Sequence, residues 1–99
     1  MNIETFYFNP YRECTYVLVN DHKQAIIIDA GMYETREQQR FAQYIQSNQL
    51  TPVALLITHA HPDHVCGQEY VEKTYGLSAI IRPAEGSLPI EGFDIQVIS

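Results

Sequence analysis

The sequence has few basic residues, few cysteines and no long apolar run. Six Lys and Arg stand against twelve Asp and Glu, which gives a formal net charge of −6 at pH 7. Because phosphate binding needs a basic surface, this balance argues against nucleic acid as a partner. No apolar run approaches the roughly 20 residues that a membrane span requires, and the first four residues lack the basic start of a signal peptide. We therefore expect no membrane contact.

The two cysteines, Cys14 and Cys66, are too few for a disulfide scaffold, which favours a reduced, cytoplasmic protein. A chain of 99 residues has room for one domain, and its apolar fraction of 45% is typical of a soluble globular protein. We predict a single domain over residues 1–99.

Apolar periodicity predicts an α+β fold with a mixed sheet and helices packed on one of its faces. The expected element order is β-β-β-α-β-α-β-β. Strands are expected at residues 3–8, 14–20, 24–29, 53–57, 79–81 and 93–98, and helices at 34–49, with Thr35 as N-cap and Gln38 three residues on, and from 64 or 65 to 75. Residues 82–92 contain two prolines and two glycines, which favours a loop.

Three of the four histidines fall within six residues, directly after the buried strand at 53–57. His59 and His61 are two residues apart, so their side chains can reach the same side of an extended backbone. Asp63 and His64 follow where the second helix is expected to begin. Imidazole is the commonest zinc ligand and also suits iron. This cluster predicts a metal site, whereas His22 is read as a solvated turn residue.

The same residues resemble a known family. His59-x-His61-x-Asp63-His64 is similar to the HxHxDH motif of the metallo-β-lactamase-fold hydrolases. Thr58 precedes the motif, Gly67 follows it, and Asp29-Ala30-Gly31 is similar to the D-x-G that ends an early strand. Asn9-Pro10 resembles the opening of the glyoxalase-II-like branch.

This resemblance implies a role for each matching residue. His59 and His61 would bind a first metal ion, and Asp63 and His64 a second, with Asp63 also orienting the reacting water. Asp29, together with Thr58, would brace the loop that carries the histidines. The implied cofactor is two zinc ions per site, with iron or manganese as alternatives. Members act mostly on thioesters, lactones, β-lactams or phosphoesters, so a small-molecule substrate is expected.

The family's remaining ligands are a third histidine, a bridging aspartate and a last histidine, all later in the chain. No histidine follows His64, and Asp94 is the only later aspartate and matches no motif. We therefore expect this chain to be the N-terminal half of a longer metallo-β-lactamase-like domain, inactive alone. Without a second sheet, one side of the strands at 25–28 and 53–57 would stay uncovered, which predicts self-association.

Three functions remain open at this point. The first is a metal-dependent hydrolase in which metal-activated hydroxide attacks a thioester or other ester. The second is a di-iron oxidoreductase or sulfur dioxygenase on the same fold. The third is a non-catalytic, self-associating module, which the absent ligands favour for the chain alone.

Overall fold

The computed structural model describes residues 2–8, 13–58, 67–81, 86–88, 90 and 92–97. The α+β class and the mixed sheet are confirmed. In chain order, the described elements are β1 (Asn2–Phe8), β2 (Glu13–Val19), β3 (Gln24–Ile28), α1 (Thr35–Ser47), β4 (Thr51–Ile57), α3 (Gln68–Tyr75), β5 (Ala79–Ile81), β6 (Gly86–Leu88) and β7 (Ile95–Val97).

The main sheet has the strand order β1-β2-β3-β4-β5. β1, β2 and β3 form an antiparallel meander, and β3, β4 and β5 run parallel to one another. The carboxyl ends of β3 and β4 therefore lie at the same edge of the sheet. Open α/β sheets bind their ligands at this kind of edge.

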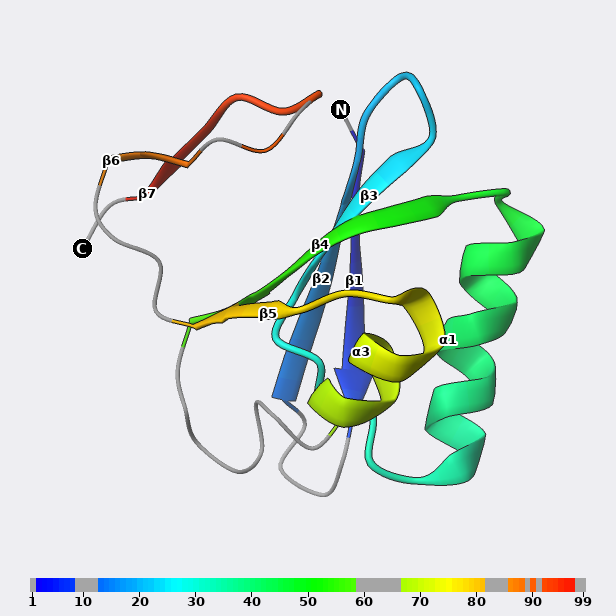
Figure 1. Cartoon of the computed structure of the whole chain (residues 1–99). Helices are drawn as coiled ribbons and strands as arrows, with labels where there is room; N and C mark the ends of the chain where they lie inside the picture. Colours follow the sequence, from blue (N-terminus) through cyan, green and yellow to red (C-terminus); the bar gives the residue numbers. More distant parts are fainter. Residues whose placement is uncertain are drawn as a thin grey trace.

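Both helices pack on one face of the sheet, as the sequence predicted. Phe41 and Ile45 of α1 and Val71 of α3 are buried in one apolar cluster with alternate residues of β3 and β4. Figure 1 shows α1 and α3 on this face, with the β6–β7 hairpin on the other. No helix among the described residues is long and apolar enough to cross a membrane.

The second face of the sheet is covered at its centre, which corrects the expectation of a face left bare. Ile26, Ala54 and Leu56 are only 0%, 7% and 5% exposed. Apolar side chains from the β6–β7 hairpin and its connection pack against them: Leu88, Ile90, Phe93 and Ile95. The continuous apolar runs in β3 and β4 thus have a partner on each side.

The predicted loop at residues 82–92 contains a strand among its described residues, 86–88, 90 and 92. Strand β6 lies inside this range and pairs antiparallel with β7. Gly86 is the first residue of β6 and Gly92 lies in the connection between β6 and β7, with φ of 115° and 88°. The glycines therefore belong to a hairpin, in conformations that glycine adopts readily, and the apolar residues of this hairpin cover the sheet.

The starts of both helices also differ from the prediction. Glu34 is the N-cap of α1 in place of Thr35, because the Glu37 side chain reaches back and accepts a hydrogen bond from the Glu34 amide at 3.1 Å. Helix α3 has Gly67 as its N-cap. The described part of the helix therefore begins at Gln68, and residues 64–66 of the predicted helix lie outside the described residues.

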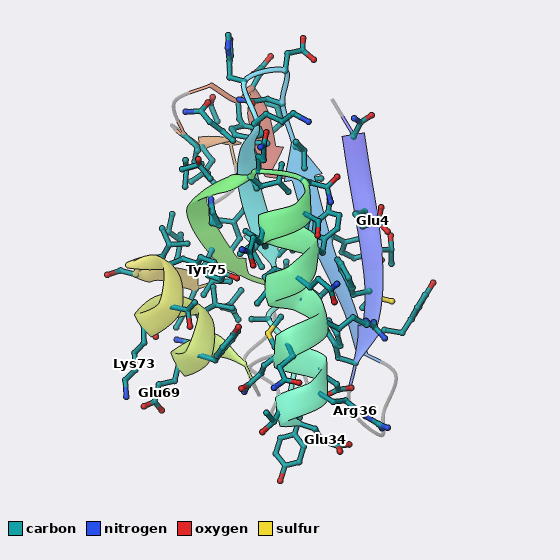
Figure 2. All side chains as sticks on the ribbon, turned by 90° about the vertical axis from the view of Figure 1, so that its right-hand side faces the viewer. Glu4, Glu34, Arg36, Glu69, Lys73 and Tyr75 are labelled. Carbon is teal, nitrogen blue, oxygen red and sulfur yellow. The ribbon has the colours of Figure 1, made fainter. Side chains whose placement is uncertain are left out.

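The outer surfaces of the helices carry charged side chains, while their facing sides are aromatic. Figure 2 shows Glu69 and Lys73 projecting from α3, where they form an exposed ion pair of 2.7 Å. Tyr75 packs edge-on against Phe41 with ring centroids 6.3 Å apart. Its partial burial raises the pKa of the Tyr75 hydroxyl to about 12. The interface between α1 and α3 thus combines aromatic packing with one hydrogen bond, from the Tyr70 hydroxyl to the Gln38 carbonyl oxygen at 3.2 Å.

Candidate metal centre

The predicted metal-binding motif begins one residue after Thr58, at the carboxyl end of β4. The four predicted ligands, His59, His61, Asp63 and His64, lie outside the described residues, as does Cys66. Among the residues that the structure describes, no three His, Cys, Asp or Glu side chains are grouped so that they could hold a metal ion. The structure therefore describes the residues on either side of the motif and the contacts that hold them.

Asp29 holds the residue that precedes the motif. Its carboxylate accepts two hydrogen bonds from Thr58, one from the backbone amide at 2.8 Å and one from the hydroxyl at 2.6 Å. Asp29 is only 4% exposed, although Thr58 itself lies at the surface. Because each carboxylate oxygen binds a different group of Thr58, both the side chain and the backbone of that residue are oriented.

The backbone of Asp29 is itself held by two neighbouring strands. Its amide donates to the carbonyl oxygen of Leu56 in β4 at 2.8 Å. Its carbonyl oxygen accepts a hydrogen bond from the hydroxyl of Thr15 in β2 at 2.5 Å. Asp29 has a φ of 60°, in the left-handed region, which aspartate tolerates better than most residues. The chain thus turns sharply where β3 ends.

The same loop also holds the residue that follows the motif. The Gly67 amide donates to the carbonyl oxygen of Ala30 at 2.7 Å. A Cβ atom on Gly67 would lie 2.2 Å from the Met32 sulfur and 2.8 Å from the Met32 carbonyl oxygen. Only glycine fits so close to this loop. Residues 29–32 therefore anchor both Thr58 and Gly67, the two residues that flank positions 59–66.

Sequence reasoning singled out Asp29, Thr58 and Gly67 but missed the part played by Thr15. Thr15 is fully buried in β2, and its hydroxyl also accepts a hydrogen bond from the Gly31 amide at 3.1 Å. The available signal was a threonine on the same face of β2 as Val17 and Val19. The predicted roles of Asp29 and Thr58 at a metal centre stay predictions. His22 is exposed in its turn.

The family of this chain follows from its sequence as well as its fold. Residues 10–98 match the profile of the Metallo-beta-lactamase superfamily. The chain therefore belongs to the metallo-beta-lactamase superfamily. It is 33% identical over 70 residues to a hydroxyacylglutathione hydrolase of Edwardsiella ictaluri (strain 93-146), a match that covers 71% of this chain and 26% of that protein. The resemblance to the glyoxalase-II-like branch is confirmed.

Solved structures support the fold. ETHE1 from Myxococcus xanthus matches 97% of this chain and 47% of its own, with a TM-score of 0.78 and 17% identity. TTHA1623, solved in a di-iron-bound form, matches 94% of this chain and 59% of its own, with a TM-score of 0.71 and 20% identity. The chain spans about a quarter to a third of the length of the curated relatives it matches.

The close contact at Gly67 gives a first prediction. We expect Gly67→Ala to lower the free energy of unfolding by about 1–3 kcal/mol, because the added methyl group overlaps the backbone of Met32 as well as its flexible sulfur. Urea unfolding measures the change. The matched control is Gln68→Ala at the next position, which should stay within about 0.5 kcal/mol. A Gly67→Ala variant as stable as the unsubstituted chain would contradict the contact.

Proposed function

We propose that the protein carrying this chain is a metal-dependent hydrolase of a small thioester or related ester. The observation that carries the proposal is the anchored end of β4, where both carboxylate oxygens of buried Asp29 hold Thr58 directly before the histidine motif. Metal ligands need a fixed geometry, and a fixed backbone before the first ligand supplies part of it. The hydroxyacylglutathione hydrolases among the relatives support a thioester as substrate.

The donor chemistry of residues 59–64 fits metals that this superfamily binds. Its members bind ions such as zinc or iron. Imidazole nitrogen and carboxylate oxygen are good ligands for both ions. We assign His59 and His61 to one zinc ion and Asp63 and His64 to a second. Iron or manganese in the same positions is the alternative.

In the proposed reaction, the metal ions activate the water and the protein side chains orient it. When bound, the zinc ions supply an activated water molecule and polarise the scissile carbonyl group. The Asp63 carboxylate accepts a hydrogen bond from the attacking water and orients it toward the carbonyl carbon. Asp29 holds Thr58 by its amide and hydroxyl, which keeps the backbone before His59 from shifting when substrate binds.

The 99-residue chain alone is expected to be inactive. A catalytic zinc ion has three protein ligands in addition to water, and His59 and His61 supply two. No histidine follows His64 in this sequence, so the remaining ligands would come from outside it. The low cysteine count supports a cytoplasmic location for the protein.

The role of Asp63 gives a direct test. In the complete protein, Asp63→Ala should lower kcat/KM for a hydroxyacylglutathione thioester by about 10²–10⁴-fold or more, because the water loses its orienting carboxylate and one metal loses a ligand. Thioester hydrolysis followed by absorbance measures the rate. The matched control is Asp21→Ala, which removes an exposed turn carboxylate and should leave the rate unchanged. An unchanged kcat/KM for thioester hydrolysis by Asp63→Ala would contradict the proposed function.

A di-iron oxidoreductase or sulfur dioxygenase is the second candidate. Imidazole and carboxylate ligands also suit iron, and the fold is shared with TTHA1623, which was solved in a di-iron-bound form. At 20% identity that similarity concerns the fold alone.

Metal content separates the two candidates. We expect the complete protein, purified without added metal, to contain about two zinc ions per chain, because three imidazoles and one carboxylate form a set that zinc binds well. Elemental analysis by mass spectrometry measures this. His61→Ala should lower the zinc content, whereas His22→Ala, in the exposed turn, should not. Iron as the main metal, with a redox-active absorption spectrum, would favour the second candidate instead.

A self-associating module is the third candidate, and the surface of β1 and β2 favours it. Ile3, Tyr7 and Tyr16 are 63%, 52% and 39% exposed on the face opposite the helices. β1 is also an edge strand of the sheet. An apolar edge strand is a ready template for a further strand. We propose a second copy of this chain as the partner, with β1 at the contact.

This proposal predicts the size of the isolated chain in solution. We expect it to sediment as a dimer or larger species at micromolar concentrations. Tyr7→Lys should shift it to the monomer, because burying the lysine ammonium group in an apolar contact costs its hydration energy. The matched control is Tyr33→Lys, which adds the same charge at a 62%-exposed position off the sheet. A monomer for the unsubstituted chain at every concentration would contradict self-association.

A further inference from the structure

The Thr15 hydroxyl connects β2 to the turn that follows β3. It donates to the carbonyl oxygen of Asp29 at 2.5 Å and accepts a hydrogen bond from the amide of Gly31 at 3.1 Å. Thr15 is 0% exposed, and both contacts are buried. One side chain thus binds two backbone groups on either side of Ala30 and fixes the path of the turn.

The backbone that Thr15 holds is also the backbone that aims the Asp29 carboxylate. Asp29 has a φ of 60°, and in this conformation its side chain reaches both polar groups of Thr58. A left-handed residue persists where its surroundings fix it. The hydrogen bonds therefore form a continuous path from Thr15 through Asp29 to Thr58, the residue before His59.

We propose that Thr15 is a positioning residue for the metal-binding segment. Its hydroxyl fixes the Asp29–Gly31 backbone so that the Asp29 carboxylate meets Thr58, and its methyl-bearing Cβ belongs to the buried helix-side face of β2. Serine at this position keeps the hydroxyl, whereas valine keeps the shape and removes it. The proposal rests on the proposed function, because the segment it positions is the proposed ligand set.

Amide hydrogen exchange in the metal-free 99-residue chain tests the path without any metal. In Thr15→Val, the amides of Thr58 and Gly31 should exchange about ten-fold faster. The Thr51 amide, which donates to the Lys23 carbonyl oxygen at 2.8 Å at the other end of β4, should not change. Thr15→Ser should restore the original rates. Thr74→Val, at an exposed position of α3, is the matched control and should have no effect.

The pattern of exchange distinguishes positioning from general loss of stability. Equal acceleration of Thr58 and Thr51 would mean that Thr15 acts on the whole fold, and it would overturn the proposal, as would unchanged exchange at Thr58. If Thr15→Val does not fold, the unsubstituted chain supplies the test. Its Thr15 hydroxyl proton should exchange slowly and show a nuclear Overhauser effect to the Gly31 amide, and the absence of this proton signal would overturn the proposal.

The zinc affinity of the complete protein tests whether the hydrogen bonds from Thr15 through Asp29 to Thr58 affect metal binding. Thr15→Val should raise the zinc dissociation constant about ten-fold, within the range for partners that orient metal ligands, and Thr15→Ser should recover it. Unchanged affinity in Thr15→Val would overturn the positioning role. If no variant binds metal, the proposed function is wrong, and the exchange rates alone decide whether Thr15 positions Thr58.

Discussion

The contact between the Asp29 carboxylate and Thr58 is the interaction on which the candidate site depends. It joins the ends of two parallel strands, β3 and β4, at the edge where the histidine motif begins. A buried carboxylate is costly unless its oxygens are bonded, and Thr58 supplies two donors to it. The same pair of bonds therefore satisfies Asp29 and fixes the backbone that leads to His59.

The sheet can offer such a stable edge because its central strands are covered on both faces. Residues of β3 alternate between two apolar clusters. Ile27 packs in the cluster on the helix side, and Ile26 packs in the cluster under the β6–β7 hairpin. A slip of β3 by one residue would turn every side chain to the opposite face and move the Asp29 carboxylate away from Thr58. The position of Asp29 relative to Thr58 therefore depends on the register of β3 and β4.

The sequence predicted the parts of this fold that depend on local pattern. Alternating and continuous apolar runs identified the meander, the amphipathic helix and the buried strand β4. The β6 strand was missed because Gly86 and Gly92 were read as loop signals, although Gly86 begins β6 and Gly92 lies between β6 and β7, in a hairpin whose apolar residues cover Ile26. The path from Thr15 to Thr58 joins residues far apart in the sequence, and no local pattern encodes such contacts. The metal ligands themselves stay predictions from the motif.

Anchoring both flanks of the motif to one loop has a consequence for metal binding. Asp29 and Ala30 hold Thr58 and Gly67, so the distance between the two ends of positions 59–66 is set before any ligand binds. Closing a loop costs conformational entropy, and this part of the cost is met when the sheet folds. If residues 59–64 bind metal as proposed, less conformational entropy would be lost on binding, which would raise the affinity of these ligands. In the proposed site, shared between this segment and ligands elsewhere, the Asp29–Met32 loop would fix the two flanks of the segment in advance.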